Sequence, residues 1–114
     1  MEESILRTIR KMLGPETIYE HYDTDIIIHI NTALSILAQA GVGPSEGFSI
    51  TSDEETWEDF LGDDTTAKRL EMVKTYVYLS VRINFDPPQS SAVLTSMEKS
   101  REMLEWRLSV AVED

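Results

Sequence analysis

The four prolines of this chain stand at three breaks, and these breaks limit how far any helix can run. Proline has no amide hydrogen and disfavours a helical residue before it, so a regular helix ends at or before such a break. The breaks are Gly14-Pro15, Gly41-Val42-Gly43-Pro44 and Asp86-Pro87-Pro88. The 114 residues have the length of one domain, so residues 1–114 are expected to form a single small all-α bundle of about four helices.

Two helices are expected before the second break. Residues 3–13 carry apolar side chains at helical spacing, which predicts a helix that ends at Gly14-Pro15. The second helix opens with Asp23-Thr24-Asp25, whose side chains suit an N-cap and a first helical turn, and runs to Gly41. The β-branched run at 26–30 could instead form a strand, but the continuation rich in alanine and leucine favours a helix.

Two more helices are expected after residue 62. The third, capped by Asp63 or Asp64, should extend to about Phe85 with apolar residues on two sides, which predicts neighbours on both sides. The fourth, capped by Ser90 or Ser91, should extend to about residue 110. Its predicted buried edge consists of Val93, Met97, Leu104 and Leu108.

A long irregular excursion separates the second and third long helices. Glycines and proline interrupt residues 42–56, and a short β piece is possible at 48–51. Ser52 followed by Glu55 fits a capping box for a short helix carrying Trp57, Phe60 and Leu61. An excursion of this length in a small domain is more often functional than decorative.

The charge and the amino-acid inventory exclude several classes of protein. Ten basic residues face 21 acidic ones, and eight of the acids lie in residues 45–64 without a base, which argues against nonspecific nucleic-acid binding. The absence of cysteine excludes disulfides, thiolate zinc sites and thiol catalysis, and suits a reducing cytoplasm. No signal peptide and no membrane span are expected, because the sequence has no long uncharged apolar run.

The residues offer little for catalysis or for metal binding. His21 and His29 are the only imidazoles, and the placement of the predicted helix start argues against a shared helix face. Asp23 and Asp25 could join Asp63 and Asp64 as hard oxygen ligands of a metal-dependent hydrolase. All four aspartates stand at predicted helix starts, however, where carboxylates are favoured anyway. No catalytic residue, metal or cofactor is therefore expected.

The aromatic residues indicate protein contacts instead. Trp57 and Phe60 lie in an acidic segment, and Trp106 lies between Glu105 and Arg107. Tryptophans in polar surroundings are enriched at interfaces, where they act as anchors. The alternative is that they seal the ends of a small core. With the break at Asp86-Pro87-Pro88, the candidate interface residues are Trp57, Phe60, Asp86, Pro87, Pro88 and Trp106.

Several phrases of the sequence match a known family in order and in spacing. They are residues 23–31 (DTDIIIHIN), 41–44 (GVGP), 47–50 (GFSI), 56–63 (TWEDFLGD), 73–79 (VKTYVYL), 85–88 (FDPP), 97–98 (ME) and 105–108 (EWRL). Together they resemble the small head–tail connector proteins of long-tailed bacteriophages, also called head-completion or adaptor proteins.

The resemblance implies a structural virion protein without enzyme activity or cofactor. It implies a ring of about a dozen copies, docked beneath the portal of the phage head, that forms the platform for the next connector or the tail. DNA would pass through this ring without specific binding, which an acidic wall would favour by repelling phosphate. The protein would be found at the head–tail interface of the virion, and in the host cytoplasm before assembly. The alternative from another class is a small acidic DNA-mimic regulator that binds a nucleic-acid-binding protein.

Overall fold

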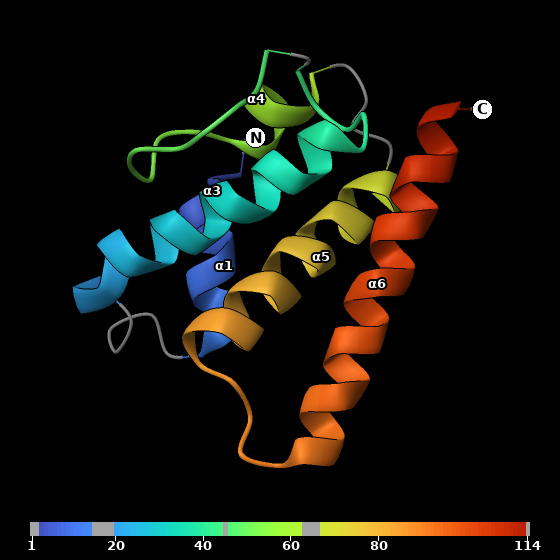
Figure 1. Cartoon of the computed structure of the whole chain (residues 1–114). Coiled ribbons are helices and arrows are strands. Elements are labelled where there is room, and N and C mark those ends of the chain that lie inside the picture. The colour runs from blue at the N-terminus through green and yellow to red at the C-terminus, as the bar shows by residue number, and fades with distance from the viewer. Residues whose placement is uncertain (1–2, 15–19, 45, 63–66, 114) are drawn as a thin grey trace.

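The computed structural model describes residues 3–14, 20–44, 46–62 and 67–113, and within them the chain is helical (Figure 1). The elements in chain order are α1 (Ile5–Leu13), the short 3-10 turn η1 (Glu20–Tyr22), α3 (Asp23–Gln39), α4 (Trp57–Leu61), α5 (Ala67–Phe85) and α6 (Ser91–Glu113). The predicted all-α bundle is confirmed. The α-helices of the described residues are the four expected long ones and α4, which is the short helix predicted to carry Trp57, Phe60 and Leu61.

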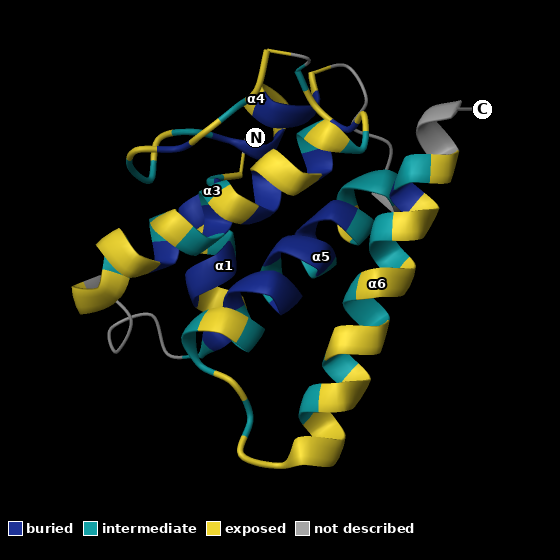
Figure 2. Cartoon of the chain, in the orientation of Figure 1, coloured by how far each residue is buried: buried dark blue, intermediate teal, exposed yellow. Residues whose placement is uncertain are grey.

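Helix α5 lies in the middle of the bundle. It packs against α3 on one side and α6 on the other, and α1 contacts both α5 and α3. In Figure 1, α5 runs nearly antiparallel to α3, whereas α6 returns upward more steeply and is inclined to both. The side chains of Val73, Val77 and Val81 are fully buried and Tyr76 is 1% exposed, which confirms that this helix has neighbours on both sides. In Figure 2 the ribbon of α5 is accordingly the most deeply buried of the long helices.

The second helix of the sequence, α3, is a helix and not a strand. Asp23 and Asp25 lie in its first turn, where their charges favour the positive end of the helix, but Tyr22 occupies the N-cap position without a side-chain hydrogen bond. The inward side of α3 contributes five fully or almost fully buried residues to the core: Ile26, Ile30, Ala33, Leu34 and Leu37.

Asn31 of α3 is one of the residues that hold the excursion between α3 and α5 to the bundle. Asn31 accepts a hydrogen bond from the amide of Ile50 at 2.7 Å and donates one to its carbonyl at 3.0 Å. The Ile50 side chain is thereby buried against the core. The possible β piece at 48–51 is not a strand. The β-type pairing in the described residues is a single bridge between Ser4 and Thr56.

The capping box of α4 lies four residues later than predicted. Thr56 accepts a hydrogen bond from the Asp59 amide at 3.1 Å, and Asp59 accepts one from the Thr56 amide at 2.9 Å. Ser52 and Glu55 instead close the turn before it, where Glu55 also accepts the Thr51 amide at 2.8 Å. Burial acts to raise the pKa of Glu55, but these hydrogen bonds outweigh it and hold the pKa below the ordinary value.

The last helix begins as predicted and ends later. Ser90 accepts a hydrogen bond from the Val93 amide at 3.3 Å, so this serine caps α6, which continues past residue 110 to Glu113. Of the predicted buried edge, Leu108 is buried, but Val93 is 47% exposed because the first turns of α6 lie beyond the neighbouring helices (Figure 2). The predicted cap of α5 by Asp63 or Asp64 lies outside the described residues.

Candidate interaction surfaces

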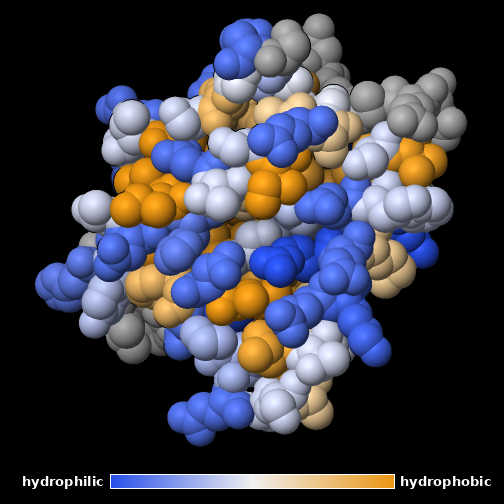
Figure 3. Space-filling model, in the orientation of Figure 1, coloured by the Kyte–Doolittle hydropathy of each residue, from blue (hydrophilic) through white to orange (hydrophobic). Residues whose placement is uncertain are grey.

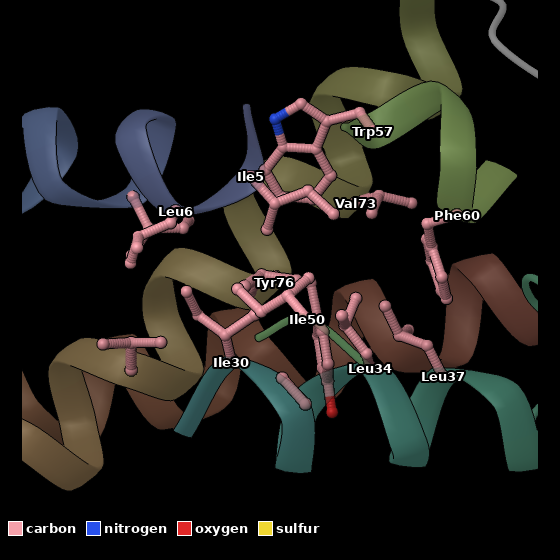
Figure 4. Packing of buried hydrophobic residues seen from close by; sticks show 14 of the residues in the cluster. Ile5, Leu6, Ile30, Leu34, Leu37, Ile50, Trp57, Phe60, Val73 and Tyr76 are labelled. Atoms are coloured by element: carbon pink, nitrogen blue, oxygen red, sulfur yellow. The ribbon is translucent and has the colours of Figure 1, made fainter. Parts of the chain in front are cut away.

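Trp57 and Phe60, both predicted at an interface, are core residues of the subunit. Each side chain is 1% exposed. The indole nitrogen of Trp57 donates to the hydroxyl of Thr8 at 3.1 Å, and the ring of Phe60 packs against that of Phe48. Figure 4 shows both aromatic side chains directed into the apolar interior shared with Leu34. The prediction that they contact partners is therefore corrected in favour of the alternative, that they seal the core.

The residues around Trp57 and Phe60 indicate that these side chains belong to the core and not to an interface. Trp57, Phe60 and Leu61 share one side of the short helix α4 and are buried, whereas Glu58 and Asp59 are exposed on the other side. The capping box fixes where the helix begins and so turns the aromatic side inward. The acidic neighbours of Trp57 thus mark the outer side of an amphipathic turn.

Trp106 is the predicted interface residue that the structure exposes most clearly. Its side chain is 66% exposed, and Met103 and Val110 are exposed at 49% and 36%. These three residues occupy positions i, i+3 and i+7 of α6, so they share one outward side of the helix. We call them the α6 stripe. The sequence analysis identified its central residue but neither of the flanking ones.

A second exposed apolar row lies on α3 and was not predicted. Ile28 is 57% exposed and Ile36 is 38% exposed, with exposed Thr32 one turn from each. We call Ile28, Thr32 and Ile36 the α3 stripe. The sequence does indicate an exposed isoleucine here, because three isoleucines in succession at 26–28 cannot all lie on one side of a helix. On the face seen in Figure 3, apolar residues lie in small groups among charged ones.

The turn between α5 and α6 is a partly exposed corner of the bundle. Pro87 is exposed, whereas Asp86 and Pro88 are half-buried. The Asp86 carboxylate lies 3.9 Å from the guanidinium of Arg82, and its amide donates to the Arg82 carbonyl at 3.0 Å. The turn thus ends α5 as predicted and leaves one proline ring accessible.

Polar contacts fix the position of α6 and of the N-terminal segment. The Tyr76 hydroxyl donates to Glu105 of α6 at 2.9 Å, and burial together with this carboxylate raises the pKa of Tyr76 to about 12. Lys74, 9% exposed, binds Glu3 at 2.9 Å. The hydrogen bond from Lys74 holds the pKa of Glu3 below its ordinary value. Both contacts tie sequence-distant segments to the central helix.

The imidazoles and aspartates considered for chemistry are not brought together. His21 is exposed, and the ring of the half-buried His29 lies 6.2 Å from that of Phe85. Asp23 lies 3.5 Å from the guanidinium of Arg10. The described residues contain no group of three or more histidines and carboxylates placed to hold a metal ion. Nor does any helix among them have the length and apolarity to cross a membrane.

Among the described acids of the excursion and α4, several form internal contacts. Asp53 pairs with Arg7 at 2.9 Å, while Glu55 and Asp59 accept the hydrogen bonds described above. Glu54 and Glu58 are exposed on the outer side of the excursion and α4. The negative charge of this segment is therefore partly structural and partly presented to the outside.

The fold and its exposed apolar residues define an all-helical protein with surfaces suited to contact with other proteins. A family model, phage connector protein, matches residues 5–114. The chain therefore belongs to the phage connector protein family, and its role is that of a structural connector of the phage virion that contacts other virion proteins. No curated protein and no solved structure matches it.

Proposed function

We propose that this protein is a ring-forming adaptor that docks under the portal of the phage head and provides the platform for further connector or tail proteins. A closed ring needs two different surfaces on every copy, because each copy meets its two neighbours through unlike patches. The observation that carries the proposal is the presence of two unlike apolar stripes, one on α3 and one on α6, which pack on opposite sides of α5.

The portal contact is assigned to the remaining exposed corner. Pro87, with half-buried Asp86 and Pro88, forms the turn that ends α5, away from the acidic excursion (Figure 1). A turn fixed by two prolines loses little entropy on binding, which suits it to docking.

The acids at the opposite end, including Glu54 and Glu58, repel phosphate and so suit a channel through which DNA passes.

The DNA-mimic alternative fits the structure less well. A mimic presents its carboxylates on a continuous face, whereas Asp53, Glu55 and Asp59 of the acidic segment are engaged within the subunit. Their charges are therefore partly neutralised or turned toward backbone amides.

We assign no enzymatic activity and no cofactor to the protein, which is made in the host cytoplasm and is incorporated at the head–tail interface.

Electron microscopy of the protein, alone and mixed with the portal protein of the same phage, tests the proposal. The expected result is a ring of this chain stacked coaxially on the portal, and a mass that corresponds to a cyclic oligomer in native mass spectrometry. Ring formation only on the portal also agrees with the proposal. A chain that stays monomeric with the portal and binds a basic host protein instead would contradict it.

A further inference from the structure

Residues 51–56 form a compact segment, which we call the acidic turn. The Glu55 carboxylate cross-links this turn from within, because it accepts hydrogen bonds from the amides of Thr51 and Ser52 at 2.8 and 3.2 Å. The hydroxyl of Ser52 accepts a further hydrogen bond from the amide of Glu54 at 3.1 Å. A segment held together by its own hydrogen bonds can open as one cooperative unit instead of unravelling residue by residue.

A buried residue anchors each end of the acidic turn. Ile50 and Trp57 are each 1% exposed, and Figure 4 shows both side chains in the same apolar interior. The backbone of Ile50 is also held by the two hydrogen bonds of Asn31, and the indole of Trp57 by its hydrogen bond to Thr8. The acidic turn therefore lies between two fixed points about which it can rotate.

The acidic turn is attached to the bundle from one side, by the start of α1. The Glu55 carbonyl accepts a hydrogen bond from the Ile5 amide at 3.0 Å, and Asp53 pairs with Arg7 at 2.9 Å. Among the described residues, the hydrogen bonds and ion pairs that leave the turn go to these residues of α1 and to the capping box of α4. Separation from α1 would thus detach the turn without breaking a contact to α3 or α5.

Glu3 joins the starts of two helices. The first amide of α1, on Ile5, bonds to the Glu55 carbonyl, and the first amide of α4, on Trp57, bonds to the Glu3 carbonyl at 3.2 Å. A helix leaves these first amides without an internal partner, so each helix start completes the other. The Glu3 carboxylate is fixed in turn by the ammonium group of Lys74 on α5, at 2.9 Å. The Lys74 side chain is 11% exposed, so this contact is better shielded from water than an ion pair on the surface.

We propose that the acidic turn is a lid that opens as one piece about its two buried anchors, and that the contact between Glu3 and Lys74 is the latch that keeps it closed. Opening separates the Ile5 amide from the Glu55 carbonyl and exposes both groups to solvent, while the side chains of the anchors stay in the core. The exposed carboxylate of Glu54 moves with the lid, so its negative charge points in a different direction in the open state. The lid belongs to the single subunit and does not depend on the ring proposed above.

Hydrogen exchange of single amides, followed by NMR on the folded chain, tests the lid. The amides of Ile5 and Trp57 should be equally protected in the wild type, because one opening breaks both of their hydrogen bonds. After correction for intrinsic rates, they should exchange about tenfold faster or more than the amides of Ile50 and Val77. Glu3→Gln, which weakens the latch, should accelerate exchange at the first two amides by a further factor of about ten and leave the other two unchanged.

Glu71→Gln is the matched control. The Glu71 carboxylate lies 3.7 Å from the same ammonium group of Lys74, but Glu71 belongs to α5 and not to the segment before α1. This variant should keep the wild-type exchange rates at all four amides. Arg7→Gln, at an exposed position, is a second test that leaves the latch intact. It should accelerate the same two amides as Glu3→Gln, because it removes the ion pair between α1 and the lid.

Three results would overturn the proposal. Equal protection of Ile5, Trp57 and Val77 in the wild type would mean that the turn opens only when the whole chain unfolds, and this result needs no variant. Acceleration at Ile50 equal to that at Ile5 would show that this anchor does not stay in place. Acceleration in Glu71→Gln equal to that in Glu3→Gln would show that the contact of Glu3 with Lys74 is not the latch.

Discussion

The hydroxyl of Tyr76 on α5 donates a hydrogen bond of 2.9 Å to the carboxylate of Glu105 on α6. This contact fixes the rotation of α6 about its axis at the residue next to Trp106. The exposed side of the helix, with its stripe of apolar residues, is thus oriented by a polar contact on the side that faces the bundle.

Replacing Tyr76 with phenylalanine should lower the free energy of unfolding by about 1–3 kcal/mol, because a half-buried carboxylate loses its donor. Chemical denaturation measures the difference, and Tyr78→Phe, a half-buried position on the same helix, is the matched control.

Tyr76→Phe should also change how the stability of the protein depends on pH in the alkaline range. The pKa of Tyr76 is raised to about 12, so the folded state holds its proton more strongly than the unfolded state. Wild-type stability should therefore fall as the pH rises above about 10, and this component should be absent in Tyr76→Phe.

The two tryptophans should respond differently to alanine. Trp57→Ala should destabilise the fold by about 3–5 kcal/mol, because it leaves a cavity in the core and removes the hydrogen bond from the indole to Thr8. Trp106→Ala should leave the thermal unfolding curve almost unchanged and weaken ring assembly by about tenfold or more. Circular dichroism and native mass spectrometry on both variants separate the effects. A stable, fully helical Trp57→Ala protein would contradict its assignment to the core.

A charge in the centre of α5 should abolish folding. Val77 is fully buried, and aspartate at this position would carry an unpaired charge into the core at a cost of several kcal/mol. Asn84→Asp, at an exposed position of the same helix, is the control and should remain folded. Soluble expression and helical signal report the outcome. A soluble, helical Val77→Asp protein would show that α5 is not enclosed as described.

The acid stability of the protein should depend on Glu3 and Glu55. Both carboxyl groups have a pKa below the ordinary value of 4.5, so each stabilises the fold above that pH. This contribution is lost as the pH falls through the lowered pKa of the folded state. Unfolding measured from pH 7 down to pH 3 should show a shallower loss for Glu3→Gln and Glu55→Gln. Glu54→Gln, at an exposed position, should follow the wild-type curve.

The helices were predictable from the sequence because their breaks are explicit. The prolines at 15, 44, 87 and 88 and the apolar spacing of α5 are local signals, and each is sufficient to end or to orient a helix. The capping box was misplaced because Ser52–Glu55 and Thr56–Asp59 both fit the pattern. The structure forms the second one, at the residue that also makes a long-range bridge with Ser4. The hydrogen-bond partner of the Trp57 indole, Thr8, likewise lies 49 residues away.

The candidate site was predictable in part. Trp106 stands out because polar residues surround it, but Met103, Ile28 and Ile36 resemble core residues in the sequence. Their exposure follows from which side of each helix α5 covers, and that choice is made by packing between segments distant in the sequence. Apolar residues beyond the number that a small core can hold are therefore visible in the sequence, but their position on the surface is not.

Gly43 lies so close to the ring of Phe60 that position 43 has no room for a side chain. A Cβ atom at residue 43 would lie 2.7 Å from ring atom Cζ of Phe60, and the backbone there has φ +90°. A smaller side chain at position 60 would remove the collision but not the backbone strain. Among related chains, position 43 should therefore stay glycine even where position 60 varies. Variation at position 43 itself would signal that the excursion leaves α3 along a different path.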